Sequence, residues 1–188
     1  MTFSPTGQLL AKHRKMHLFD IDIPGKIKFI ESDALSAGST LTLIETEYGK
    51  IGLGICYDVR FPELAMIGAR KGAFLMVYPG AFNTFTGPMH WELLAKARAI
   101  DNQVYVALCS PSRNTEGKGY LAWGHSSVVD PNAEVVATTD EKEGIVECEL
   151  SPERIVEVRS GVPITQQRRF DVYADVSAVG PSQPGEKE

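Results

Sequence analysis

The sequence KIGLGICYDVRFPELAMIGARKGAFLMVY, residues 50–78, decides the fold of this chain. Two apolar runs, 50–56 and 73–78, flank a helical stretch at 62–71. A proline opens the helical stretch, where the first N–H groups have no internal acceptor, and a glycine follows its last residue. The stretch therefore predicts a strand, a helix and a second strand, which is the repeating unit of an α/β fold.

The same alternation continues toward the C-terminus and then changes. After residue 121, apolar segments are separated only by turns, which predicts a β meander that closes the core. Ser151 is typical of a helix N-cap. The opening residues predict two short strands around a Pro5-Thr6-Gly7 turn. The remaining predicted elements are a helix at 88–102, strands at 104–109, 122–130, 134–138 and 144–150, and a helix from 152 to about 159.

Composition fits one globular α/β domain with mixed sheets. The chain has 188 residues, 43% of them apolar, and a net charge of −5. We expect the domain to cover residues 1–174 and residues 175–188 to form a disordered tail. Basic residues form no large cluster, so nucleic acid is not an expected partner. The longest apolar run, 73–78, is far shorter than the roughly 18 residues of a membrane span, so no membrane contact is expected.

Three cysteines occur without a CxxC spacing, which predicts free thiols in a reducing compartment. The first ten residues lack the plan of a secretory signal. We therefore expect a cytoplasmic protein, with a mitochondrial address as the alternative.

Cys56 lies at the end of the first apolar run, after Gly52 and Gly54, which permit close backbone approach. Ligands of open α/β sheets bind at the carboxyl ends of strands, and a nearby helix start favours the nucleophilic thiolate. A cysteine is also one of the most frequently buried residues. Both interpretations stay open for Cys56, whereas packing is favoured for Cys109 and Cys148, which lie in alternating strand patterns.

Lys15 lies in HRKMHLFDIDIPG, residues 13–25, at the end of a predicted strand. A lysine there either stabilises a developing oxyanion or is an ordinary surface lysine. His13 and His17 suggest a metal site only weakly, because their spacing implies no ligand geometry, and none is predicted. Glu31 is either a carboxylate base or a solvated loop charge.

Charged residues also surround Cys56. We expect Asp58, Arg60 and Glu63 to form ion pairs that fix the turn. The segment GAFNTFTGPMHW, residues 80–91, has the composition of a pocket-lining loop or of a long packed connection. Arg98 either anchors a substrate carboxylate or holds its helix through an ion pair.

Four ordered segments together resemble the carbon-nitrogen hydrolase (nitrilase) superfamily. They are HRKMHLFDIDIPG, GICYDVRFPEL, YPGAFNTFTGPMHWELLAKARAIDNQVYVA and YLAWGHSSVVDPNAEVVA. Within the superfamily, the segments LFDIDIPGKIKFIES and TGPMHWELL resemble the omega-amidase branch. Members of this branch hydrolyse the terminal amide of short dicarboxylate monoamides such as α-ketoglutaramate and α-ketosuccinamate. The resemblance implies an α-β-β-α sandwich, no cofactor and no metal. It also implies homo-oligomers that pair through helices next to the nucleophile, here 62–71 and 88–102.

The resemblance assigns roles to individual residues. Cys56 would attack the amide carbon and form a thioester, and Lys15 would stabilise the oxyanion together with the backbone N–H of Tyr57. Glu31 matches an accessory glutamate of the family. Phe82, in the loop after the second strand, and Arg98 are expected to contact the substrate.

One departure from the family pattern concerns the general base. In the family this glutamate lies well upstream of the lysine, and here 14 residues precede Lys15. The sequence therefore predicts an N-terminally truncated domain with uncovered strands and no triad glutamate, for which Glu31 is a possible substitute. Loss of a positioned base costs about 10²- to 10⁴-fold in rate. Two alternatives follow: an impaired remnant that pairs with a full-length homologue, or an amidase for another small molecule, of the deaminated-glutathione type.

Overall fold

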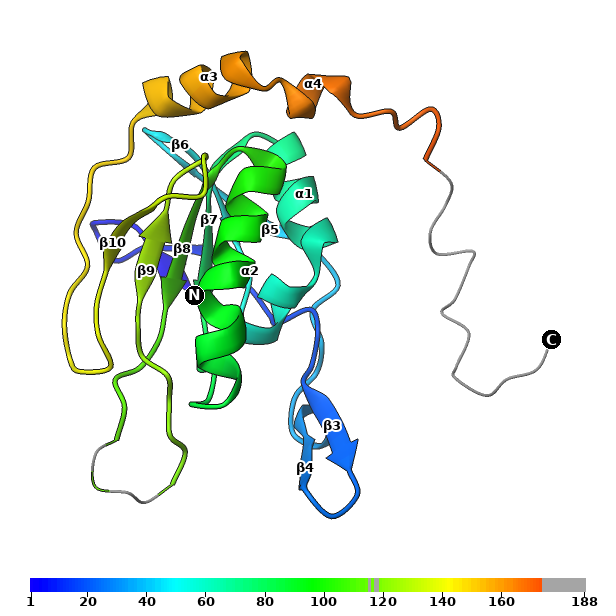
Figure 1. The fold of residues 1–188 in the computed structure, drawn as a ribbon, viewed down its shortest axis with the longest axis vertical. Helices are drawn as coiled ribbons and strands as arrows, with labels where there is room; N and C mark the ends of the chain where they lie inside the picture. The colour runs from blue at the N-terminus through cyan, green and yellow to red at the C-terminus, as the bar shows by residue number, and fades with distance from the viewer. Residues whose placement is uncertain (115, 117–118, 174–188) are drawn as a thin grey trace.

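The computed structural model describes residues 1–114, 116 and 119–173. A mixed six-stranded sheet forms its centre (Figure 1). Its strands are β5 (Thr42–Thr46), β6 (Gly49–Leu53), β7 (Ala73–Pro79), β8 (Tyr105–Cys109), β9 (Ser127–Val129) and β10 (Val135–Thr138). They lie in the order β10-β9-β8-β7-β6-β5, with β6, β7 and β8 mutually parallel and the other neighbouring pairs antiparallel.

Two helices cover one face of this sheet: α1 (Pro62–Arg70) and α2 (Thr86–Asn102). Each is the crossover between parallel strands, α1 between β6 and β7 and α2 between β7 and β8. The sheet and helices enclose the main core. Its fully buried side chains include Met76, Tyr78, Val106 and Val129 from the strands and Leu64, Trp91, Ala95 and Ala99 from the helices.

Two glycines, one within β6 and one just after it, let β7 pack closely. Met76 lies against the α-carbon of Gly52, and Tyr78 lies against that of Gly54, so a methyl group at either glycine would overlap the neighbouring side chain. The glycines therefore do permit a close approach, but side chains of β7 make it rather than another backbone.

A further helix lies on the opposite face of the sheet. Helix α3 (Pro152–Gly161) places Ile155 against Leu75 and Tyr105, whose side chains alternate with those of the main core. As predicted, Ser151 caps this helix, because its hydroxyl accepts the backbone N–H of Arg154 at 3.2 Å. A short helix, α4 (Ile164–Gln167), then crosses the end of α1 and α2 (Figure 1).

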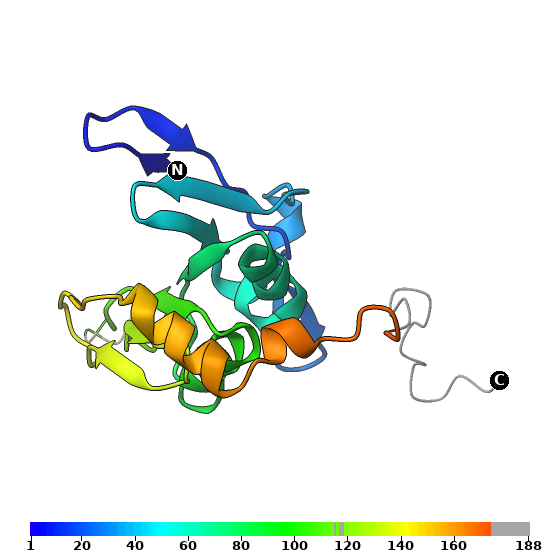
Figure 2. The ribbon, with the colours of Figure 1, turned by 90° about the horizontal axis from the view of Figure 1, so that it is seen from above.

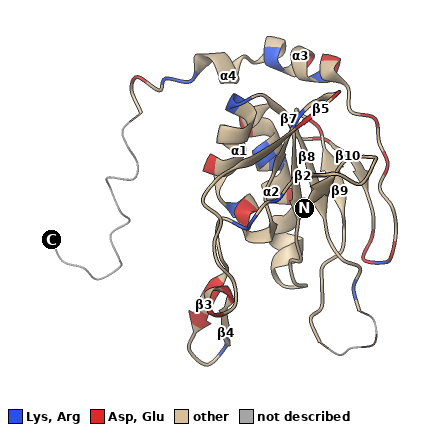
Figure 3. Cartoon of the chain, turned by 180° about the vertical axis from the view of Figure 1, so that it is seen from behind, with Lys and Arg blue, Asp and Glu red and all other residues tan. Residues whose placement is uncertain are grey.

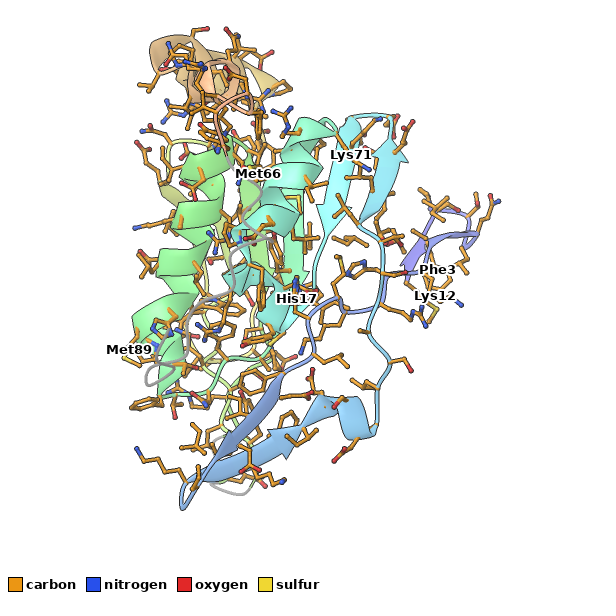
Figure 4. The ribbon with its side chains drawn as sticks, turned by 90° about the vertical axis from the view of Figure 1, so that its right-hand side faces the viewer. Phe3, Lys12, His17, Met66, Lys71 and Met89 are labelled. Atoms are coloured by element: carbon orange, nitrogen blue, oxygen red, sulfur yellow. The ribbon has the colours of Figure 1, made fainter. Side chains whose placement is uncertain are left out.

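Two hairpins stand outside the central sheet. The predicted N-terminal pair, β1 (Thr2–Phe3) and β2 (Leu9–Ala11), lies beside β5 (Figure 2). The second pair, β3 (Asp20–Ile23) and β4 (Ile27–Ile30), projects from the body of the molecule (Figures 1 and 4). The sequence patterns did not predict this hairpin, although its Pro24-Gly25 turn between alternating residues is a hairpin signal.

The α/β class with mixed sheets is confirmed, and α1 with α2 on the six-stranded sheet forms one α layer and one β layer of the expected sandwich. Residues 144–150 were wrongly predicted to be a strand, since they form no ladder with a described neighbour. Cys109 and Cys148 are exposed rather than packed. The predicted tail, 175–188, lies outside the described residues. Within the described part, no helix is both long enough and apolar enough to cross a bilayer.

Candidate active site

Cys56 lies on a tight turn between β6 and α1. The sequence predicted a strand through Cys56, but β6 ends at Leu53 and Cys56 opens a 3₁₀ helix, Cys56–Arg60. The φ angle of Cys56 is +48°, in the left-handed region that is unfavourable for residues other than glycine. A backbone in this conformation cannot continue a strand, so the chain turns at Cys56, directly after the extended Ile55.

The turn also depends on a neighbouring glycine. A methyl group placed on Gly80, directly after β7, would lie 2.7 Å from the α-carbon of Cys56. Cys56 is therefore held against the backbone at the carboxyl ends of β6 and β7, the edge of the sheet where α/β folds bind ligands.

Lys15 forms an ion pair with Glu31, and both side chains are largely shielded from solvent. Lys15 Nζ lies 2.5 Å from Glu31 Oε2, and the same oxygen accepts the backbone N–H of Phe19 at 2.8 Å. Glu31 begins a 3₁₀ helix directly after β4, so the projecting hairpin brings it back to Lys15. The sequence suggested both residues separately, and the structure brings them together.

Aromatic contacts connect the Lys15 segment to the Cys56 turn. Lys15 Nζ lies 6.0 Å from the centre of the Tyr57 ring, and the Phe19 ring meets Tyr57 edge to face at 4.9 Å. The imidazole of His17 stacks on Phe61 with ring centres 3.7 Å apart (His17 is labelled in Figure 4). Lys15 therefore lies next to the residue that follows Cys56.

The carboxylate of Asp58 connects the same two segments from inside the protein. The residue is fully buried, with 0% of its surface exposed. It accepts the backbone N–H of Ile55 at 2.8 Å and both the backbone N–H and Nδ1 of His17, at 2.9 and 2.8 Å. His13 Nε2 lies 3.8 Å from Oδ2, beyond hydrogen-bond distance, while His13 Nδ1 contacts the Thr42 hydroxyl at 3.0 Å.

This environment favours the ionised form of Asp58. Burial opposes ionisation, but the neighbouring His13 and the N–H groups of Ile55 and His17 outweigh it and lower the pKa of Asp58 to about 2. Asp58 therefore stays charged at neutral pH and holds the residues before Cys56 and after Lys15 in fixed positions.

The expected ion pairs among Asp58, Arg60 and Glu63 are wrong, although Asp58 does fix the turn. Among the described residues Asp58 instead binds backbone N–H groups and histidine. Arg60 points the other way: its guanidinium lies 4.6 Å from the centre of the Phe82 ring and 3.2 Å from His90 Nδ1. Because Asp58 turns inward and Arg60 stacks on an aromatic ring, the two charges do not meet.

Phe82 and Arg98, which were expected to contact substrate, are both buried. Phe82 packs edge to face on Trp91 with ring centres 5.0 Å apart. Arg98 donates from Nε to the Val59 carbonyl at 2.8 Å and from Nη2 to the Arg60 carbonyl at 2.9 Å. The ion pair of the structural alternative for Arg98 is present in the same helix, where Asp101 Oδ2 lies 3.8 Å from Nη1. The substrate role of both residues stays a prediction.

A tyrosine outside the residues proposed from sequence also lies near Cys56. The Tyr120 hydroxyl donates to the Ala81 carbonyl at 2.5 Å, in the loop after β7. Burial raises the pKa of Tyr120, and negative charge on Cys56 raises it further. The sequence carried no signal for this residue, because it enters from the chain between β8 and β9.

Comparison with known proteins agrees with this arrangement. The family model for carbon-nitrogen hydrolases matches residues 1–160. The omega-amidase NIT3 of Saccharomyces cerevisiae is 61% identical over 94% of this chain, and the omega-amidase NIT2 of Danio rerio is 56% identical over 92%. The crystal structure of Saccharomyces cerevisiae Nit3, a member of branch 10 of the nitrilase superfamily, aligns with a TM-score of 0.78 and 58% identity over 87% of this chain.

The chain is shorter than these relatives. It spans 60% of NIT3, 62% of the Danio rerio NIT2 and 56% of the Nit3 crystal structure. The family match nevertheless covers most of the chain and includes Lys15, Glu31 and Cys56. The chain thus belongs to the carbon-nitrogen hydrolase family.

Proposed function

We propose that this chain hydrolyses the terminal amide of short dicarboxylate monoamides, such as α-ketoglutaramate and α-ketosuccinamate, to the dicarboxylate and ammonia. The observation that carries the proposal is the Lys15–Glu31 pair packed against the turn that presents Cys56. Identity of 56 to 61% to omega-amidases supports the same substrate class.

In the proposed reaction the Cys56 sulfur bonds to the amide carbon, and the carbonyl electrons move to oxygen. Lys15 and the N–H of Tyr57 stabilise this oxyanion, since Tyr57 is in the first turn of a helix, where N–H groups lack internal acceptors. Collapse breaks the C–N bond, and the nitrogen leaves as ammonia with the proton that the Cys56 thiol gave up. Water then cleaves the thioester, which restores the thiol and releases the carboxylate.

We assign Glu31 to positioning Lys15 rather than to proton transfer. Its Oε2 already accepts hydrogen bonds from Lys15 and from the Phe19 N–H. Among the described residues, no carboxylate is hydrogen-bonded to the Cys56 sulfur. The family resemblance implies a further glutamate as the proton acceptor. Turnover by this chain alone therefore tests whether the reaction proceeds without that glutamate.

The test is ammonia release from α-ketoglutaramate by the purified chain, with Cys56→Ser as the blank. The control is Cys148→Ser, because Cys148 is also a free cysteine but is exposed and far along the chain. We expect release that Cys56→Ser abolishes and Cys148→Ser leaves unchanged. Parallel assays with deaminated glutathione as the substrate test the alternative, an amidase of the deaminated-glutathione type. A folded chain with no release above the blank would overturn the proposal and favour a partner subunit of a longer homologue.

We further propose that the chain pairs through α1 and α2. Exposed apolar side chains on these helices support this proposal, namely Ile67, Met89 and Leu93. Sedimentation of the wild-type chain and of Leu93→Lys tests it, and a monomeric wild-type chain would contradict it. The three free cysteines favour a reducing compartment such as the cytosol, which localisation of a tagged full-length protein would test.

A further inference from the structure

A separate pocket of about 230 Å³ lies at the end of α1 remote from Cys56. Helix α1 has nine residues and is thus about 13 Å long, with its first residue near the Cys56 turn and its last in this pocket. The pocket is built from three parts of the chain: the end of α1, the end of α2, and the α3–α4 segment above them (Figure 1; Met66, which lines it, is labelled in Figure 4).

Three arginines line the pocket, and no carboxylate does. They are Arg70 of α1, Arg159 of α3 and Arg168 after α4, and they are joined by the polar side chains of Asn102 and Thr165. In Figure 3 the ribbon is blue, the colour of Lys and Arg, at this end of α1. Three fixed positive charges without a lining acid are unfavourable unless an anion approaches them.

The guanidinium groups are only partly used by the protein. Arg168 donates to the Asp101 carbonyl and so caps α2, and Arg70 stacks on Phe170 with its guanidinium carbon 4.0 Å from the ring centre. Arg159 Nε is buried without a hydrogen-bond partner among the described residues. Burial also lowers the pKa of Arg159. A buried donor without an acceptor is costly, so the site is incomplete as it stands.

Helix capping and local ion pairing do not account for this cluster. Arg168 caps the end of α2, whereas Arg70 and Arg159 form no ion pair with a described residue. Asp101, whose backbone carbonyl accepts from Arg168, has its carboxylate 3.8 Å from Arg98 rather than paired with a pocket arginine. Two guanidinium groups therefore keep free donors toward the pocket.

We propose that this pocket binds a small oxyanion with two negative charges, of the phosphate or short-dicarboxylate kind. Guanidinium forks bind both kinds of group through paired hydrogen bonds. The volume is below the roughly 300–1,000 Å³ of sites for drug-sized ligands, which fits a small anion. This site is independent of the proposed amidase chemistry, since it does not include Cys56, Lys15 or Glu31.

Titration calorimetry of the purified chain with inorganic phosphate and, separately, with α-ketoglutarate tests the proposal, at a constant ionic strength set with sodium chloride. We expect saturable binding of at least one of them, together with a rise in melting temperature that chloride does not produce. Binding of phosphate alone assigns a phosphate site. α-Ketoglutarate is also the product of the proposed amidase reaction, so its binding assigns a dicarboxylate site to this pocket only where Cys56→Ser keeps the binding and the pocket variants below weaken it. Saturable binding of neither anion overturns the proposal.

Variants of the pocket arginines then test whether the anion binds in this pocket. Arg159→Gln and, as a second variant, Arg70→Gln should each weaken binding at least tenfold. The control is Arg169→Gln, because the exposed Arg169 pairs with Asp171 and does not line the pocket. Circular dichroism identifies any variant that fails to fold, and the other pocket variant then decides. Unchanged affinity in a folded pocket variant, or equal loss in Arg169→Gln, contradicts this location.

Discussion

Asp58 binds His17 twice, through the backbone N–H at 2.9 Å and through the imidazole Nδ1 at 2.8 Å. The other carboxylate oxygen accepts the N–H of Ile55, the residue before Cys56. One buried side chain thus joins the segment that carries Lys15 to the turn that carries Cys56. The relative position of the proposed nucleophile and cation therefore depends on a residue that need not touch substrate.

Replacing Asp58 by Asn should lower the free energy of unfolding by roughly 3 kcal/mol at pH 7. The amide keeps one acceptor oxygen but turns an N–H₂ group toward the N–H donors of Ile55 or His17. Urea denaturation measures the loss. The control is Asp22→Asn, whose exposed carboxylate pairs with Lys28 and should contribute under 1 kcal/mol.

The stability difference between wild type and Asp58→Asn should depend on pH. The pKa of Asp58 is about 2 in the folded state and close to 3.8 in the unfolded chain, so its ionisation stabilises the fold above pH 4. That contribution, about 2 kcal/mol, should disappear as pH falls from 4 through 2. The stability difference between wild type and Asp58→Asn should narrow over this range. A constant difference would show that the charge of Asp58 is not what stabilises the turn.

Glu31→Gln should reduce ammonia release by about 10²-fold, because it removes the charge that holds Lys15 in place. Stability should fall by roughly 1–3 kcal/mol, since the pair is largely shielded from solvent and Lys15 loses its counter-charge. The comparison variant is Asp33→Asn, in the same 3₁₀ helix but exposed. Equal turnover in both variants would exclude a positioning role for Glu31.

Local patterns were sufficient to predict the central elements. The apolar runs around β6, β7 and β8 and the prolines near the starts of α1 and α2 identify the parallel layer. β7 and β8 are largely buried and therefore have nearly continuous apolar sequences. The ends of helices differ from the predicted ends where a side chain outside the apolar pattern forms a capping hydrogen bond. Helix α2 begins at Thr86, before the predicted start at Pro88, because the Asn83 side chain accepts the N–H of Thr86 at 2.7 Å.

The sequence predicted which residues form the candidate site but not which of them contact one another. Lys15, Glu31 and Cys56 were singled out by motif, yet their arrangement depends on pairings between distant segments that no local spacing encodes. Asp58 was expected to bind a neighbouring arginine, and its partner His17 is 41 positions away. The tertiary fold determines such long-range hydrogen bonds, so the sequence around Asp58 could not specify them.

Arg98→Ala should lower the free energy of unfolding by roughly 2–4 kcal/mol, because the carbonyls of Val59 and Arg60 lose buried donors. The matched change Lys96→Ala, on the exposed side of α2, removes only a surface pair with Glu92 and should contribute under 1 kcal/mol. Measuring the KM for α-ketoglutaramate distinguishes a structural role of Arg98 from a role as substrate anchor. A KM for α-ketoglutaramate that rises more than tenfold in the folded variant would support the substrate anchor instead.

Gly80→Ala should disturb the Cys56 turn directly. The added methyl would lie 2.7 Å from the α-carbon and 3.0 Å from the β-carbon of Cys56, and backbone atoms cannot move aside as a flexible side chain can. We expect a loss of roughly 1–3 kcal/mol in stability. Ammonia release should also fall, because the thiol is displaced from Lys15.

The matched variant is Gly161→Ala, at the last residue of α3, where no atom lies within 4 Å of the added methyl. Alanine is the better helix former by roughly 0.5–1 kcal/mol, so this variant should be neutral or slightly more stable. Urea denaturation and alkylation of Cys56 by iodoacetamide, followed by peptide mass spectrometry, compare the two. If Gly80→Ala retains the stability and Cys56 reactivity of Gly161→Ala, the close contact between Gly80 and Cys56 does not shape the site.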